Sequence, residues 1–306
     1  MKYPIPAFLK SIIVIHIDAV KKWIDDKALR LAAALAFYAA FSIGPMLLLL
    51  LSIASLFVSE ESVRSMIINE LERSMGETGV KVVEGMISSA QSKEKGVIMT
   101  LVSLGIVLFS ATGLFYQLKD ALNTIWGVKV KKGLSIIAII KDRALSFTLI
   151  ISIGFLMLVS LVMTALIAGF SGWIEQKLLF SSYLIQLINW SLATTLTTIL
   201  FAMMYKMLPD VKVPWRSVWY AAFITAVLFS ALKQGLAVYL GTGTDSTYDA
   251  PGALILVLSW VYFSSMLLIF GAELSYVISK RRNLPIRLNR FAEWEDDSPE
   301  AERIPS

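Results

Sequence analysis

Glu273 is the residue of this chain whose type and place best suit chemistry. It directly follows a stretch from Gly252 to Ala272 that carries no charge, and apolar residues flank it. Charged groups inside a membrane are costly, and those that occur there often mark ion or substrate paths. Glu273 could carry a proton or contact a substrate. The structural alternative is a carboxylate paired with Arg30, Lys119 or Arg143 at the inner ends of neighbouring helices.

Lys233 is a second ionisable residue within an apolar segment. At ~1.5 Å per helical residue it lies roughly 26 Å beyond Arg216, in the outer part of the membrane and far from Glu273. Its ammonium could reach the outer lipid headgroups along its apolar stem. It could also pair with Asp245 or Asp249, or bind an anionic headgroup.

Two other apolar segments carry hydroxyl groups or residues that bend helices. Thr194, Thr195 and Thr198 share one helix face, which favours interhelical hydrogen bonds and close packing or, alternatively, the lining of a polar cavity. Ser42 and Pro45 predict a kink or a discontinuity in the first apolar segment. Broken helices occur at transporter binding sites. Our candidate transport or ligand residues are therefore Glu273, Lys233, Asp249, Tyr248, Ser42, Pro45, Thr194, Thr195 and Thr198.

Several other chemistries are excluded by what the sequence lacks. There is no cysteine, which excludes disulfides and thiolate nucleophiles, and the single histidine, His16, cannot build a histidine cluster for zinc. There is no GxxxxGK[ST], HExxH or GxSxG motif. We expect no catalytic residues, no metal, no cofactor and no nucleic-acid partner.

The elements that must position these residues are membrane helices. The chain is 57% hydrophobic and 17% charged, against roughly 45–50% and 25% in soluble domains. The fold class we predict is an all-α integral membrane protein with six transmembrane helices and interfacial amphipathic helices. The predicted spans are approximately Leu29–Val58, Val97–Leu118, Ala144–Phe170, Leu184–Tyr205, Val218–Leu240 and Gly252–Ile278.

The distribution of basic residues predicts the orientation. Of the Lys and Arg residues outside the spans, twenty lie on the side of both termini and six on the other. Cytoplasmic loops carry the excess of positive charge, so both termini are predicted to be cytoplasmic. Residues 1–28 form an amphipathic segment that either lies at the membrane interface or packs on the bundle as an ordinary helix. Residues 29–280 are the transmembrane domain with an extracytoplasmic helical loop at 59–96, and 281–306 are a polar, disordered tail.

Four motifs, in this order, cover most of the chain. They are AAALAFYAAFSIGPMLLLLLSIA in the first span, ALNTIWGV at Ala121–Val128, LPDVKVPWRSVWYAA at Leu208–Ala222 and SWVYFSSMLLIFGAELS at Ser259–Ser275. Together they resemble the YihY/BrkB family of bacterial inner-membrane proteins. The resemblance implies six spans, cytoplasmic termini and a multi-pass location in the bacterial cytoplasmic membrane. It also brings an older ribonuclease label, against which the single histidine argues.

Three functions follow from these features. The leading hypothesis is a transporter or flippase-like protein for a lipid or other amphiphilic anion, driven by an ion gradient with Glu273 as the proton carrier. The second is a non-catalytic scaffold that organises envelope assembly through Ser59–Gly96. The third is an enzyme acting on lipids. The partners we expect are membrane lipids and an anionic amphiphile, and a homo-oligomer stays open.

Overall fold

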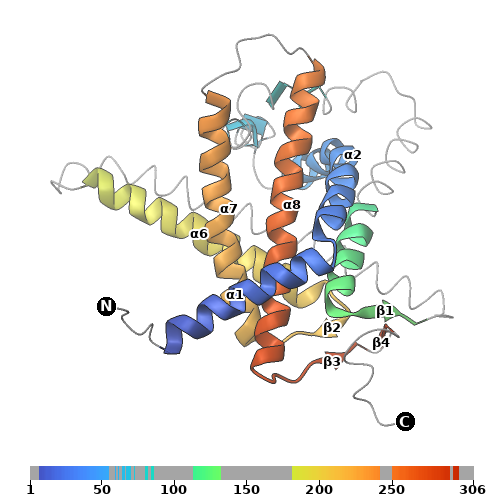
Figure 1. Ribbon diagram of the computed structural model, residues 1–306. Coiled ribbons are helices and arrows are strands. Elements are labelled where there is room, and N and C mark those ends of the chain that lie inside the picture. The colour runs from blue at the N-terminus through green and yellow to red at the C-terminus, as the bar shows by residue number, and fades with distance from the viewer. Residues whose placement is uncertain are drawn as a thin grey trace.

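The protein is mostly helical in the computed structural model (Figure 1). The structure describes residues 7–54, 113–131, 181–241, 250–289 and 292–295, with scattered positions between 59 and 85. The helices are α1 (Ala7–Asp25), α2 (Ala28–Ala54), α6 (Ser181–Met207), α7 (Trp215–Gly241) and α8 (Ala250–Arg281), with a further helical segment over residues 113–126.

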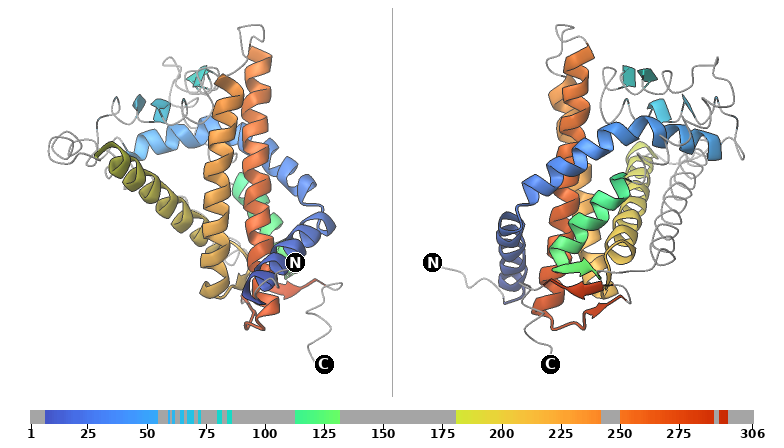
Figure 2. Two further views of the ribbon diagram at one scale, coloured as in Figure 1. Left: turned by 60° about the vertical axis from the view of Figure 1, so that its left-hand side comes forward. Right: turned by 90° about the vertical axis from the view of Figure 1, so that its right-hand side faces the viewer.

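Helices α7 and α8 run side by side and form the long axis of the molecule (Figures 1 and 2). Within the described part of the chain, these two helices are long and apolar enough to cross a membrane, over Trp215–Leu236 and Ile255–Arg281. A shorter apolar stretch covers Ala28–Ser42 of α2.

Four of the six predicted spans fall on described helices, namely α2, α6, α7 and α8. The span predicted at Ala144–Phe170 lies outside the described residues, as does most of Val97–Leu118. The number of spans therefore stays a prediction, whereas the helical character of the four described segments agrees with their apolar length.

Small residues let α6, α7 and α8 approach one another closely. Ala221, Ala222 and Ala226 of α7 are fully buried, and small side chains at such contacts are typical of membrane helices. The hydroxyl of Tyr205, near the end of α6, donates to the carbonyl oxygen of Leu268 at 3.0 Å and lies 3.1 Å from Oγ1 of Thr225. Figure 2 shows α6 diverging from α7 away from this meeting point.

Helix α2 is continuous over its whole range, Ala28–Ala54. Figure 2 shows that it changes direction part-way along its length. The residues Ser42 and Pro45 therefore lie in a helix that bends and is not interrupted, although nothing is described of the Pro45 side chain.

Helix α1 lies across the end of α8 that follows Met266 (Figure 1). Ile15 and Ala19 are buried there, and Nε1 of Trp23 donates to the carbonyl oxygen of Met266 at 3.4 Å. The helix also keeps an exposed apolar stripe at helical spacing, formed by Ile13, Ile17, Val20 and Ile24. One face of α1 thus packs on the bundle while another remains uncovered.

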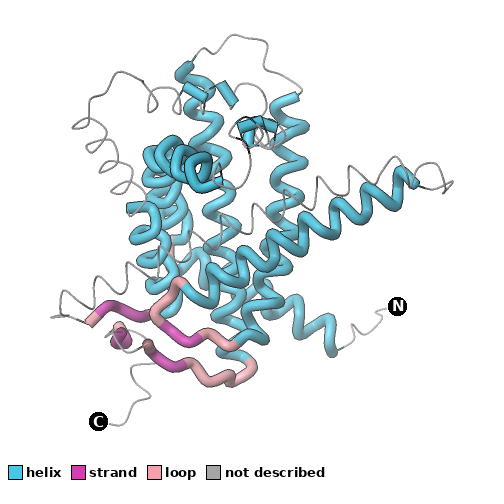
Figure 3. Tube along the Cα trace, turned by 180° about the vertical axis from the view of Figure 1, so that it is seen from behind, coloured by secondary structure: helices cyan, strands magenta, loops and turns pink. Residues whose placement is uncertain are grey.

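Four short strands correct the expectation of an all-α chain. Strand β1 (Val128–Val130) pairs antiparallel with β4 (Ala292–Trp294), and β2 (Val211–Lys212) with β3 (Arg287–Leu288). Figure 3 shows the strands and their loops gathered at one end of the bundle. Residues 281–306, predicted to be a disordered tail, therefore contain two ordered strands. The reason is that their backbone groups find partners on loops distant in sequence, and Leu288 and Trp294 pack against the core.

The segment 59–96 is described only at scattered positions. Ile67 and Val80 are helical and buried there, and Arg64 and Glu84 form an ion pair at 3.6 Å. The rest of the predicted loop, with its two amphipathic helices, lies outside the described residues.

The close approach of the helices makes Gly271 a test of the packing. A Cβ added to Gly271 would meet the Tyr205 hydroxyl and Thr225 Oγ1 closer than real atoms approach, whereas one added to Gly235 would meet nothing within 4 Å. Gly271→Ala is therefore expected to lower stability by about 1–3 kcal/mol, and Gly235→Ala to cause no loss. Thermal unfolding of the detergent-solubilised protein checks this. Equal midpoints for the two variants would contradict the packing described.

Candidate functional site

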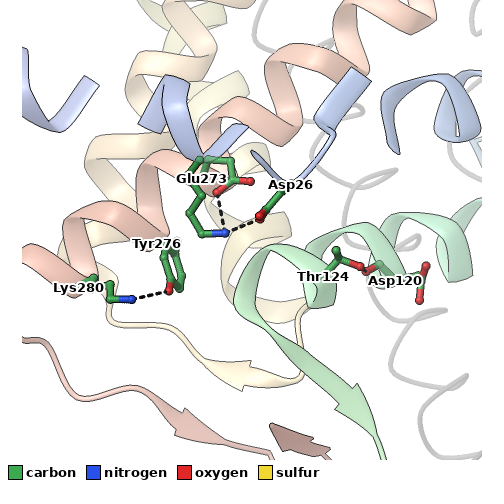
Figure 4. Close-up of polar contacts among 7 residues, drawn as sticks. Asp26, Asp120, Thr124, Glu273, Tyr276 and Lys280 are labelled. Carbon is green, nitrogen blue, oxygen red and sulfur yellow. Dashed lines mark hydrogen bonds and ion pairs between the residues drawn. The ribbon is translucent and has the colours of Figure 1, made fainter. Parts of the chain in front are cut away.

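Glu273 lies inside the candidate span of α8, and its side chain is 0% exposed. Nζ of Lys22, on α1, forms an ion pair with its Oε2 at 3.4 Å. Neither oxygen of Glu273 has a hydrogen-bond partner in the described part of the chain. Lys22 also pairs with Asp26, in the turn that follows α1, so one ammonium lies between two carboxylates (Figure 4). Within the described part of the chain, the site is thus a buried anion with Lys22 as its close cation.

Tyr276 lies one turn beyond Glu273 on α8 and is contacted by two lysines. Nζ of Lys22 lies 4.5 Å from the centre of its ring, and Nζ of Lys280 donates to its hydroxyl at 3.1 Å. The Trp126 ring packs edge-on against it at 5.4 Å. Tyr276 therefore helps to fix the ammonium of Lys22 beside Glu273, because cations over aromatic faces are attracted by the ring.

A cleft of about 580 Å³ opens next to this cluster. Its walls are α1, residues 124–127, the last turns of α8 and Glu295. Lys22 and Asp26 belong to the lining, whereas Glu273 does not. The Lys22 and Asp26 side chains therefore lie between the buried carboxylate of Glu273 and the cleft. The lining residues are Asp18, Lys21, Lys22, Asp25, Asp26, Thr124, Ile125, Gly127, Tyr276, Val277, Lys280, Arg281 and Glu295.

The cation beside Glu273 is not among the three expected from the sequence. Lys119 instead pairs with Asp210 at 3.0 Å, Arg30 is exposed, and Arg143 lies outside the described residues. Sequence reasoning missed Lys22, although its place in an amphipathic helix was visible. That helix could have reached α8 in many registers, and only the packing of Ala19 and Trp23 on the bundle selects this one.

A second polar cluster holds the helix over residues 113–126 against the turn before β2. The buried amide of Asn123 donates to Oδ2 of Asp210 at 2.9 Å and accepts from the Asp210 backbone N–H at 2.8 Å. The carbonyl oxygen of Asp210 accepts from the backbone N–H of Asn289 at 2.9 Å. Three distant segments meet at Asp210, and these bonds give it a structural role.

Of the remaining candidate residues, those whose side chains the structure describes do not contact Glu273 or line the cleft. Thr195 and Thr198 donate to carbonyl oxygens of their own helix, and Thr195 is exposed. Among the described residues, the hydrogen bonds that these two hydroxyls donate stay within their own helix. Oγ1 of Thr194 is buried without a partner among the described residues.

Ser42 and Lys233 lie on other elements. Ser42 is buried and bonds to the carbonyl oxygens of Tyr38 and Ala39 in its own helix. Lys233 is half-buried on α7. Tyr248 and Asp249 lie outside the described residues. In the described ranges no group of three or more His, Cys, Asp or Glu side chains is arranged to hold a metal ion.

Comparison with known proteins identifies the family of this chain. The family model described as virulence factor BrkB matches residues 19–295. The chain belongs to the BrkB family. It is 26% identical over 263 residues to a UPF0761 membrane protein of Pseudoalteromonas translucida, covering 85% of this chain and 84% of that protein.

Two other relatives carry the same name. A UPF0761 membrane protein of Vibrio vulnificus is 29% identical, with 82% of this chain and 78% of that protein covered. One of Pseudomonas paraeruginosa is 27% identical, with 86% of this chain but 64% of that protein covered. No solved structure matches the chain. This BrkB-family chain is thus a membrane protein, and the matched range contains both Lys22 and Glu273.

The ion pair between Lys22 and Glu273 can be tested by charge removal. Lys22→Ala leaves a buried carboxylate without its cation, and we expect a loss of about 3 kcal/mol. The Lys22→Ala/Glu273→Gln double variant removes both charges and should recover most of that loss. Unfolding of the purified protein in detergent measures both, with the exposed Lys21→Ala as the control. A double variant no more stable than Lys22→Ala would show that the pair is not formed.

The Asn123–Asp210 contact predicts that substitutions at the neighbouring residues Asn123 and Thr124 will change the stability of the protein by different amounts. Asn123→Ala removes both hydrogen bonds and leaves the backbone N–H of Asp210 without its acceptor, although Oδ2 keeps Lys119 as a partner. The loss should cost about 1–3 kcal/mol. Thr124→Ala removes an exposed hydroxyl that bonds to its own helix and should change stability little. Equal unfolding midpoints would refute the structural role of Asn123.

Proposed function

We propose that this BrkB-family membrane protein is a transporter or flippase-like protein for a lipid or other amphiphilic anion. The observation that carries the proposal is the fully buried carboxylate of Glu273 within a candidate span, linked through Lys22 to an open cleft. Intramembrane carboxylates of this kind are characteristic of ion and substrate paths.

A contribution to folding stability does not by itself explain why the protein has the buried Lys22–Glu273 ion pair. Removing two charges from water costs free energy that their attraction often fails to recover, and apolar residues of similar volume can replace such pairs without loss. Glu273 has Lys22 as its close cation and no hydrogen-bond donor among the described residues. This arrangement suits a group that exchanges its charge state during a functional cycle.

Proton coupling follows from the same geometry. When the carboxylate of Glu273 takes up a proton, its attraction for the Lys22 ammonium falls, and Lys22 retains Asp26 as its partner. The ammonium can then move towards the cleft, where a substrate anion would compete for it. In this scheme Glu273 carries the proton and Lys22 responds to its charge.

The orientation we propose puts this cleft on the cytoplasmic side of the bacterial inner membrane. Helix α1, the strands and the basic end of α8 with Lys280 and Arg281 lie at the same end of the bundle (Figures 1 and 3). Positive residues favour the cytoplasmic side. Both termini would then be cytoplasmic and the remaining spans would complete a multi-pass protein.

A translocation assay tests the transport proposal. The purified protein is placed in liposomes that contain a fluorescent phosphatidylglycerol, and an impermeant quencher reports the fraction of probe that changes leaflet with and without a pH gradient. We expect wild type to move the probe and to respond to the gradient, and Glu273→Gln to lose most of both. The matched control is Asp120→Asn, the same chemical change at an exposed position that does not line the cleft.

Two results would count against this function. Equal transport by wild type and Glu273→Gln would remove Glu273 from the path. No translocation of the probe by wild type, with or without a gradient, would favour the scaffold hypothesis, in which Ser59–Gly96 organises envelope assembly.

A further inference from the structure

The cleft beside Glu273 carries both signs of charge in equal number. Four of its lining side chains are basic and four are acidic, and Tyr276 lies among them. The basic ones are Lys21, Lys22, Lys280 and Arg281, and the acidic ones are Asp18, Asp25, Asp26 and Glu295. A site of this composition has little net charge, yet it presents donors and acceptors for both a phosphate and an ammonium group.

Part of this charge is used within the protein. Lys22 is held by Asp26 and Glu273, and Arg281 by Asp18. Lys21 and Asp25 are exposed on α1 beside these pairs. Lys280 donates to the hydroxyl of Tyr276 at 3.1 Å, and Glu295 is exposed. These internal contacts fix the walls of the cleft, and Lys21, Asp25 and Glu295 keep exposed charges on its lining.

Two observations place the cleft at the level of lipid headgroups. Its α8 wall is formed by the final turns of a candidate span that ends at Arg281, where basic residues meet headgroups. Its α1 wall belongs to a helix with an exposed apolar stripe, formed by Ile13, Ile17, Val20 and Ile24. Helices with one apolar and one charged face lie in the membrane interface.

Exposed tryptophans at the start of α7 mark the same level of the membrane. The rings of Trp215 and Trp219 stack 5.9 Å apart and are exposed, as aromatic residues at a membrane interface are. The rings of His16 on α1 and Tyr220 on α7 lie edge to face with their centres 6.1 Å apart, so α1 meets α7 in the first turns that carry these tryptophans. At this level the headgroups of the adjoining leaflet would lie within reach of the cleft.

We propose that the cleft binds the phosphoethanolamine headgroup of a zwitterionic phospholipid. The phosphate lies towards Lys21 and Lys280, and the ammonium towards Asp25 and Glu295. Asp18 and Asp26 already pair with Arg281 and Lys22. A headgroup with only negative charge would therefore bring its phosphate near Asp25 and Glu295 without offering them a cation. A primary ammonium suits these carboxylates because it donates up to three hydrogen bonds.

A quaternary ammonium fits this cleft less well. Recognition of choline uses open aromatic faces, and the face of Tyr276 that Lys22 covers, with its ammonium 4.5 Å from the ring centre, is not open. A choline group also donates no hydrogen bond to Asp25 or Glu295. The cleft is therefore expected to bind an ethanolamine headgroup more tightly than a choline headgroup or an anionic one.

This inference rests on the proposed function only in taking a membrane lipid as the ligand. A lipid can bind in the cleft without being moved across the bilayer. The experiment below measures binding, so the headgroup proposal and the transport proposal can fail separately.

Native mass spectrometry of the full chain in detergent measures the binding. The protein is mixed with equal amounts of phosphatidylethanolamine, phosphatidylglycerol and phosphatidylcholine with identical acyl chains. We expect wild type to retain phosphatidylethanolamine about tenfold over the other two, the equivalent of one charge-assisted hydrogen bond. The Asp25→Asn/Glu295→Gln variant should lose this preference and gain phosphatidylglycerol, and Lys21→Gln/Lys280→Gln should retain less of every phospholipid.

Matched controls change the same charges outside the cleft. Lys10→Gln and Asp120→Asn, both at exposed positions, should keep the wild-type preference. Wild type without a preference for phosphatidylethanolamine, or a preference that survives Asp25→Asn/Glu295→Gln, would overturn the proposal. Soluble O-phosphoethanolamine is added in a separate arm. If it displaces the lipid at equal concentration, the ligand is a free phosphate ester and the lipid part of the proposal is wrong.

Discussion

The buried carboxylate of Glu273 constrains the end of this molecule more than any other single group. An anion within a membrane helix needs a cation close by, and the one beside it, Lys22, comes from a helix that begins far away in the sequence. For that pair to form, α1 must lie across the end of α8 with Ala19 buried and Trp23 bonded to α8. The position of α1 in turn creates one wall of the cleft. One electrostatic requirement thus links the packing of a helix to the shape of a site.

The other walls of the cleft depend on hydrogen bonds outside the apolar core. Asn123 and Asp210 hold the helix over residues 113–126 against the turn before β2, and Asn289 brings the C-terminal segment to the same point. Strands β1 to β4 extend this connection, and Glu295 donates its backbone N–H to Gly127 at 2.8 Å. Backbone groups that leave the helices are paired here, as buried polar groups must be. The charged lining is therefore attached to a framework that is held from three directions.

The two proposals use different parts of this arrangement. Transport depends on Glu273, which lies behind the lining and whose charge governs Lys22. Headgroup binding depends on the balanced charges of the lining itself, at the level where α8 leaves the membrane. If both hold, the lipid headgroup and the coupling carboxylate share Lys22 as their common neighbour. That shared cation offers a physical route from protonation to lipid binding, because protonation of Glu273 would free Lys22 for the lipid phosphate.

The sequence by itself determined the class of the protein and the places of four described helices, since long uncharged apolar runs leave few alternatives to membrane helices. It also singled out Glu273, because a lone carboxylate in such a run is conspicuous. It did not identify Lys22, Asn123 or the strands within residues 281–306. Lys22 and Asp26 lie far from α8 in the chain, and β3 and β4 find their partners on loops that precede them by tens of residues. Contacts of that kind depend on how helices pack, so only the tertiary structure decided which cation meets Glu273 and what lines the cleft.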